Sequence, residues 1–197
     1  MPQPDHVISL GLTVPDSPAE ADIKKYFDKC AEKIGFVPNV IKGYAARPAR
    51  WRTFVAMYHA LMDKDGSKLS PLEREMIAVV VSSVNRCYYC LVAHGQAVRK
   101  LSGDPELGEM LVMNYRVAEL SKRQRAMLDF AMKVSRSAEE ISESDFAALA
   151  AHGFSNDDVW DIAAIAAFFA LSNRLANVTA MRPNDEFYLM GRLPKGA

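Results

Sequence analysis

Serine-led helix starts constrain the fold of this chain more than any other feature. Ser70-Pro71-Leu72-Glu73 combines an N-cap serine, a proline at the first helical position and a glutamate at the third, the pattern of a capping box. Ser121 to Gln124 repeats this pattern, and Ser142 to Asp145 and Ser155 to Asp158 are similar. We find no Asn-Gly or Asp-Gly turn between alternating short strands. The sequence therefore predicts an all-α fold.

The helices are predicted from these starts and from the apolar periodicity that follows each of them. Gly35, Gly66, Gly103 and Gly153 lie between the periodic segments, where glycine commonly ends a helix. The predicted helices span 18–34, 38–45, 48–63, 71–84, 87–101, 106–113, 121–135, 142–151 and 155–177.

One helical domain, 18–180, is expected between two arms. The arms, 1–17 and 181–197, are rich in proline and polar residues and are predicted to be extended. The domain divides into N-terminal helices (18–64), a central core (70–135) and C-terminal helices (142–180).

Charge and apolar content exclude several classes of protein. The formal net charge is zero and the pI is about 6.9, and no basic run argues for nucleic acid or an anionic membrane. The longest apolar run, Ile162 to Leu171, is about half the roughly twenty residues of a membrane span, and the N-terminus lacks the pattern of a signal peptide. An odd number of cysteines favours a reducing compartment. We therefore expect a cytoplasmic protein.

Two cysteines and a histidine lie close together in the segment "NRCYYCLVAH". On a helix at about 100° per residue, Cys87 and Cys90 are about 60° apart around the axis, and His94 falls between them. Because side chains at i and i+4 meet on a helix, His94 can contact the Cys90 sulfur and stabilise its thiolate. The helix N-terminus adds a partial positive charge. The pair can also close a disulfide, so one sulfur can attack and the other resolve the product.

Other interpretations of the two cysteines remain open at this point. Zinc requires four ligands, and no second Cys-x-x-Cys or histidine pair lies nearby. A structural disulfide conflicts with a cytoplasmic setting. Two buried apolar cysteines beside an incidental histidine need no chemistry at all. A reactive dithiol fits the spacing best, and we expect neither a metal nor a cofactor.

Glu75 is the candidate proton acceptor. It lies twelve residues before Cys87, on a helix whose segment Met76 to Val81 is apolar on every side and must be buried. A desolvated carboxylate there is suited to act as a general base. A pairing with a nearby arginine is the alternative. Since one continuous helix would place Glu75 about 120° away from Cys87, a break near Ser83–Arg86 is required to fold it back.

The arrangement Glu75, eleven residues, Cys87-x-x-Cys90-x-x-x-His94 resembles the AhpD-like alkylhydroperoxidases of the carboxymuconolactone decarboxylase superfamily. The segments "FVPNVIKGYAARPARWRTF" and "FFALSNRLANV" resemble its peroxidase-related branch. The resemblance implies an all-α homo-oligomer (dimer, trimer or hexamer) that acts as an antioxidant thiol peroxidase with an unknown thiol reductant. It implies that Cys90 attacks the hydroperoxide, that Cys87 closes the disulfide, and that Glu75 and His94 form a proton relay.

One position departs from that family. Its best-known members carry a histidine immediately before the second cysteine, where this chain has Tyr89, and a phenol cannot replace an imidazole as a base. Tyr89, Tyr88 and His59 are possible pocket residues, and Cys30 is interpreted as a core or surface thiol. A redox sensor or disulfide-exchange protein is the alternative function, and a lactone decarboxylase-like enzyme a weaker one, because those relatives lack the paired cysteines.

Overall fold

The computed structural model describes residues 5–63 and 67–193, and within these ranges the chain is helical and contains no strand. Every predicted helix is present, and the largest shift at a helix end is at the first, which begins at Ala21 rather than at 18. Its N-cap residue, Glu20, makes no capping hydrogen bond through its side chain. Gly66 lies outside the described residues. The helices are α1 (Ala21–Ile34), α2 (Asn39–Ala45), α3 (Pro48–Met62), α4 (Pro71–Val84), α5 (Tyr88–Ser102), α6 (Leu107–Asn114), α7 (Lys122–Ser137), α8 (Glu143–Ala150) and α9 (Asn156–Val178), with short 3-10 turns η1 (Tyr115–Val117), η2 (Ala138–Glu140) and η3 (Asp185–Tyr188).

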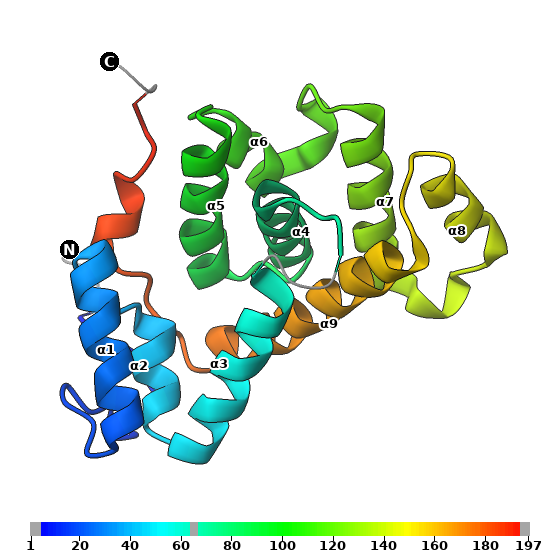
Figure 1. Ribbon diagram of the computed structural model, residues 1–197. Helices are drawn as coiled ribbons and strands as arrows, with labels where there is room; N and C mark the ends of the chain where they lie inside the picture. The colour runs from blue at the N-terminus through cyan, green and yellow to red at the C-terminus, as the bar shows by residue number, and fades with distance from the viewer. Residues whose placement is uncertain (1–4, 64–66, 194–197) are drawn as a thin grey trace.

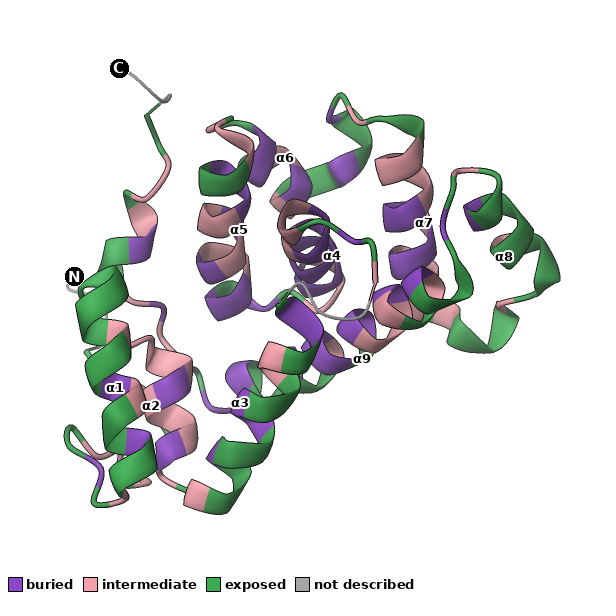
Figure 2. Cartoon of the chain, in the orientation of Figure 1, coloured by how far each residue is buried: buried purple, intermediate pink, exposed green. Residues whose placement is uncertain are grey.

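Helix α4 is the centre of the fold. It packs against α3, α5, α6, α7 and α9, which surround it in Figure 1. Its residues from Met76 to Val81 are fully buried, as their all-round apolar character predicted, and most of α4 is purple in Figure 2. The outer helices α1 and α8 expose most of their surface. Burial of this apolar surface is the main source of stability for the domain.

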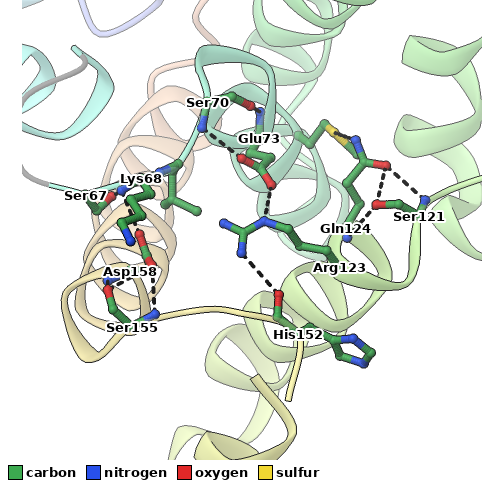
Figure 3. A network of polar contacts seen from close by, with 12 residues as sticks. Ser67, Lys68, Ser70, Glu73, Ser121, Arg123, Gln124, His152, Ser155 and Asp158 are labelled. Atoms are coloured by element: carbon green, nitrogen blue, oxygen red, sulfur yellow. Dashed lines mark hydrogen bonds and ion pairs between the residues drawn. The ribbon is translucent and has the colours of Figure 1, made fainter. Parts of the chain in front are cut away.

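Hydrogen bonds connect the capped N-terminal regions of α4, α7 and α9 (Figure 3). Ser70 accepts the Glu73 backbone N–H, and Glu73 accepts the Ser70 N–H in return, which completes the predicted capping box. The second oxygen of Glu73 accepts from Arg123 Nε at 3.1 Å, and Arg123 also donates to the His152 carbonyl. The boxes at Ser121, Ser142 and Ser155 are present as well. Each N-cap contributes about 1 kcal/mol.

A tight turn separates α4 from α5 at the predicted place. Asn85 follows the last residue of α4, and Arg86 adopts a left-handed backbone with φ +50°. This lets the N–H of Cys87 return to the carbonyl of Ser82 at 3.0 Å. The two helices therefore lie side by side instead of forming one long rod, and residues far apart in sequence come to face each other.

The terminal segments pair with each other instead of extending into solvent. The N–H of Arg182 donates to the Val7 carbonyl, and the N–H of Ser9 donates to the Thr179 carbonyl. The C-terminal segment, predicted to be an extended arm over 181–197, forms the turn η3 and buries Phe187. Arg99 of α5 causes this, because its buried guanidinium donates to the carbonyls of Phe187 and Met190. Residues 1–4 and 194–197 of the two arms lie outside the described residues.

Helix α9 is long and apolar enough to cross a membrane by length and composition alone, the one such helix in the described ranges. It packs against α3, α4, α5 and α7, and nearly half of its most apolar window is buried inside the fold. Core packing therefore accounts for the buried part of its apolar surface.

Candidate active site

The two thiols lie where α5 begins. Cys87 is the N-cap residue of α5, and Cys90 lies in the first turn. Both are buried, with exposed fractions of 0% and 1%. All three cysteines of the chain carry free thiols, including the half-buried Cys30. The turn at Arg86 is the reason that Cys87 reaches the N-cap position, where unpaired backbone N–H groups favour a negative charge.

Cys87 is the more acidic thiol. The Cys90 thiol, which hydrogen bonds to the Cys87 sulfur, is the largest influence and lowers the pKa of Cys87. Burial opposes this effect, while the Cys90 backbone N–H, Asn173 and the charge of His94 support it, and the resulting pKa is about 7. The same hydrogen bond raises the pKa of Cys90 well above its ordinary value, and burial adds to that. The first proton to leave the pair therefore comes from Cys87.

Asn173 of α9 interacts with both sulfurs. Its amide hydrogen bonds to Cys87 and to Cys90, and in both cases it lowers the pKa of the thiol. The side chain is fully buried and is itself fixed, since its Nδ2 donates to Ser82 at 2.9 Å and its oxygen accepts from Asn85 at 3.0 Å. The neighbouring Ser172 also hydrogen bonds to Cys90. Sequence reasoning missed this pair, although Ser-Asn in the apolar segment "FFALSNRLANV" is a visible polar interruption.

Glu75 and His94 form a hydrogen-bonded pair next to the thiols. The distance from His94 Nδ1 to Glu75 Oε2 is 2.7 Å, and both side chains are largely buried. The imidazole also stacks edge-on against Phe169, with ring centroids 4.6 Å apart. His94 and Cys90 line the same cavity, and the contact between them that the helix spacing predicts stays a prediction. Nδ1 of His94 is directed at the carboxylate on α4, and the charge of His94 lowers the pKa of Cys87.

Two of the three arginines considered as alternative partners of Glu75, Arg74 and Arg99, bind other groups. Arg74 is fully buried and binds the Leu61 carbonyl and Asp161, and Arg99 binds the C-terminal segment. The packing of α4 against α5 therefore pairs Glu75 with His94.

Cys90, Glu75 and His94 share one cavity of about 250 Å³. Its walls are mainly aliphatic and aromatic, and no lysine or arginine is among the described residues that line it. Cys87 is not a lining residue and lies behind Cys90. The remaining walls come from α1, α2, α3, α9 and η3, and they include Tyr26, Cys30, Val40, Ile41, Phe54, Tyr58, Phe168, Phe169 and Phe187. A molecule in this cavity can therefore reach Cys90 before Cys87.

The three possible pocket residues lie in different places. Tyr89 lines the cavity, and its hydroxyl accepts the Val40 N–H at 3.1 Å. Burial raises its pKa far above the ordinary value, so the phenol stays protonated. Tyr88 is half exposed and faces away from the cavity, since consecutive helical residues are about 100° apart; its hydroxyl bonds that of Tyr188. His59 does not line the cavity either, because Tyr26 lies between.

Cys30, interpreted from the sequence as a core or surface thiol, is half-buried on α1 and lies in the wall of the same cavity as Cys90. Burial raises its pKa, which makes it less reactive than the pair on α5. In the described part of the chain, no group of three or more His, Cys, Asp or Glu side chains gathers as a metal site would.

The chain is similar to known proteins in both sequence and fold. Residues 48–111 match the model of the carboxymuconolactone decarboxylase family. An uncharacterized peroxidase-related protein from Silicibacter sp. TM1040 is 55% identical and superposes with a TM-score of 0.92, with 98% of this chain and 100% of that chain covered. A peroxidase-related protein from Ralstonia eutropha JMP134, described as an alkylhydroperoxidase AhpD core, is 50% identical with the same TM-score, and 97% and 100% of the two chains are covered.

The debrominase Bmp8 shares the fold. It is 18% identical, with a TM-score of 0.76 over 93% of this chain and 97% of that chain. No curated protein matches the chain.

Proposed function

The chain belongs to the AhpD-like, peroxidase-related group of the carboxymuconolactone decarboxylase family, and from that premise we propose that it is a thiol peroxidase that reduces organic hydroperoxides with Cys90 and Cys87. One observation carries the proposal: Cys90 opens into an apolar cavity beside the Glu75–His94 pair, with a second, acidic thiol directly behind it. This arrangement supplies an attacking sulfur, a resolving sulfur and a proton acceptor in one place.

The proposed cycle has three steps that balance. The Cys90 sulfur attacks the outer peroxide oxygen, the O–O bond breaks, and Cys90 becomes a sulfenic acid while the alcohol leaves. The Cys87 sulfur then attacks the sulfur of Cys90, which forms the disulfide and releases water. Two equivalents of a thiol reductant exchange with the disulfide and restore both thiols.

The two sulfurs differ in their access to the cavity and in their acidity. Cys90 faces the cavity but holds its proton, whereas Cys87 loses its proton first but is screened by Cys90. We assign the attack to Cys90 because only this sulfur meets the substrate, and the Glu75–His94 pair takes up its proton as the O–S bond forms. A pKa of about 7 keeps a large fraction of Cys87 ionised near neutral pH in the reduced protein, and a thiolate favours closure of the disulfide.

The cavity favours small, uncharged organic hydroperoxides. Its volume of about 250 Å³ and its apolar walls suit an alkyl or aryl group, and no cationic side chain among the described lining residues would hold a carboxylate or phosphate. The cycle needs a thiol donor, so a reducing cytoplasm is the proposed location.

A homo-oligomer is part of the proposal. One face of α9 exposes Trp160, Leu171 and Val178, which are 76%, 60% and 72% exposed. Beside it, Met57 of α3 and Leu175 of α9 line an apolar groove of about 830 Å³. Apolar surface of this kind at helical spacing suits the same helix of a second copy.

The test is stopped-flow oxidation of the reduced protein by tert-butyl and cumene hydroperoxide, followed by turnover with dithiothreitol. The parent should be oxidised quickly and turn over repeatedly, Cys90→Ser should not react, and Cys87→Ser should stop at the sulfenic acid. Cys30→Ser controls for the loss of a thiol from the cavity wall, and it should still be oxidised and turn over repeatedly because both thiols of α5 remain.

The proposal fails if Cys90→Ser consumes hydroperoxide as fast as the parent. A single oxidation without turnover would indicate a redox sensor instead. Since a debrominase shares the fold, release of bromide from 2,3,4-tribromopyrrole without peroxide reduction would also overturn the assignment.

A further inference from the structure

Three residues form a hydrogen-bonded chain that leads from the cavity to the surface. Tyr26 of α1 lines the cavity, and its hydroxyl lies 3.0 Å from Nε2 of His59. Nδ1 of His59 lies 3.0 Å from Oδ2 of Asp63. The side chains of His59 and Asp63 are 39% and 62% exposed, so the far end of the chain is in contact with solvent. The order tyrosine, histidine, aspartate connects an enclosed hydroxyl with bulk water through an imidazole.

The order of these groups allows protons to move in one defined way. When Nδ1 donates to Asp63 and His59 is neutral, Nε2 accepts the Tyr26 proton. When His59 takes up a proton from solvent, Nε2 becomes a donor to the Tyr26 oxygen. The hydroxyl proton of Tyr26 is then free to be donated into the cavity. Asp63 stabilises the His59 imidazolium that forms before the proton moves on to Tyr26.

The proposed cycle consumes one proton that the two cysteines and the hydroperoxide do not provide. If Cys87 is a thiolate, the reaction is Cys87–S⁻ plus Cys90–SH plus ROOH plus one proton, giving the disulfide, ROH and water. The Cys90 proton, held by the Glu75–His94 pair, leaves with the water that forms at the second step. One proton must therefore come from outside the dithiol site, and the alkoxide released at the first step, a strong base, is a group that can take it.

We propose that Tyr26, recharged through His59 and Asp63, protonates the alkoxide that leaves when Cys90 attacks the hydroperoxide. The inference rests on the proposed function and deepens it by assigning the general acid. The O–O bond breaks, RO⁻ takes the Tyr26 proton, the Tyr26 oxygen takes the Nε2 proton of His59, and His59 regains a proton from solvent. Burial, the largest influence, raises the pKa of Tyr26 to about 12, so the phenol is protonated before each turnover.

Tyr58 provides a second phenol in the wall of the cavity. Burial is the largest influence that raises its pKa, and the charges of Glu75 and then of Tyr26 follow. Glu75, Tyr58 and Tyr26 therefore line one cavity and interact electrostatically.

The experiment compares two oxidants that differ in the leaving group. tert-Butyl hydroperoxide releases an alkoxide, a strong base that must be protonated, whereas peracetic acid releases acetate, which leaves without a proton. In single-turnover stopped flow, Tyr26→Phe should slow oxidation by tert-butyl hydroperoxide by about 100-fold, the scale of general acid catalysis. Oxidation by peracetic acid should stay within about twofold of the parent.

A matched control separates this effect from the loss of a buried hydroxyl. Tyr115→Phe removes a buried hydroxyl that donates to Asp129 at 2.5 Å away from the cavity, and it should change neither rate. His59→Ala should lose rate with the alkyl hydroperoxide only, and added imidazole should restore it, because the site is open to solvent.

The outcomes distinguish the two proposals. If the parent reacts with both oxidants and Tyr26→Phe slows both equally, or slows neither, the relay is wrong and the peroxidase assignment stands. If the reduced parent reacts with neither oxidant, the peroxidase function and the relay both fail. Selective loss with the alkyl hydroperoxide, together with rescue of His59→Ala by imidazole, supports the relay.

Discussion

Glu75 and His94 are nineteen residues apart in the chain, yet His94 Nδ1 and Glu75 Oε2 lie 2.7 Å apart. The contact joins α4 to α5 and exists because the chain reverses at Asn85 and Arg86. It turns a carboxylate at the edge of the central helix into a partner of the imidazole beside the dithiol.

Replacing Glu75 by Gln should slow oxidation by hydroperoxide by about 100-fold, because the amide can still bond His94 but cannot take up a proton. The melting temperature should change little. The control is Glu73→Gln, two residues earlier, which weakens the capping box and the ion pair with Arg123 and should lower stability by about 1 kcal/mol at an unchanged rate. An unchanged rate for Glu75→Gln would leave Glu75 with a structural role only.

The reduced protein should contain one thiolate that titrates near pH 7. The Cys87 pKa of about 7 predicts that thiolate absorbance in the far ultraviolet rises as the pH increases through that value. Cys90→Ala should move the midpoint upward, because the Cys90 hydrogen bond is the largest cause of the shift, and Cys87→Ser should abolish the transition. Folding lowers the pKa of Cys87, so its ionisation stabilises the reduced fold at pH values above the ordinary pKa of a thiol. This stabilisation is lost as the pH falls through about 7. A transition that survives in Cys87→Ser would contradict the assignment.

Asn173→Ala should affect stability and thiol acidity together. It removes the partner of the fully buried Ser82 hydroxyl, which should lower the free energy of unfolding by about 2 kcal/mol. It also removes a hydrogen bond to each sulfur, so the thiolate midpoint should rise. Asn177→Ala, one helical turn later, removes only the bond to the Asn85 carbonyl and should leave the midpoint in place. Equal midpoints in the two variants would argue against the role of Asn173.

Phe187→Ala should widen the range of hydroperoxides accepted. Phe187 lines the cavity from η3 and packs edge-on against Phe36, with centroids 5.1 Å apart. The variant should lose about 3 kcal/mol of stability, while the rate with cumene hydroperoxide should rise relative to that with tert-butyl hydroperoxide. The ratio of the two rate constants is the measurement, because it is insensitive to the fraction of folded protein. A constant ratio would show that η3 does not limit the size of the substrate.

Leu171→Glu should break the proposed oligomer. The side chain lies on the exposed face of α9, so a charge there opposes burial against a second copy without touching the core. Light scattering after size-exclusion chromatography should show a smaller species than the parent. Leu189→Glu, at an exposed leucine on the C-terminal segment, is the control and should leave the mass unchanged.

Much of the fold followed from local signals. The capping boxes at Ser70, Ser121, Ser142 and Ser155 act within four residues, so each helix start could be predicted without knowledge of its neighbours. The all-round apolar segment of α4 predicted its central place for the same reason: such a helix is stable only when every face is covered.

Other relationships depend on how the helices pack. No local signal indicates that Asn173 hydrogen bonds to the thiols or that Cys30 and Tyr26 line the cavity of Cys90. The same is true of the hydrogen bond by which Arg99 binds the C-terminal segment. The 2.7 Å contact between His94 and Glu75 likewise depends on packing, because the carboxylate lies on the neighbouring helix α4.

The sequence by itself determined where each helix begins and ends, which faces are apolar, and that two thiols and a histidine lie close together on one helix. Only the tertiary structure decided which thiol is acidic, which one meets the cavity, and how the proton-carrying side chains are joined. The physical reason is range: capping and periodicity act over a few residues along the chain, whereas hydrogen bonds and burial in a cavity depend on the turn at Arg86 and on the packing of helices distant in sequence.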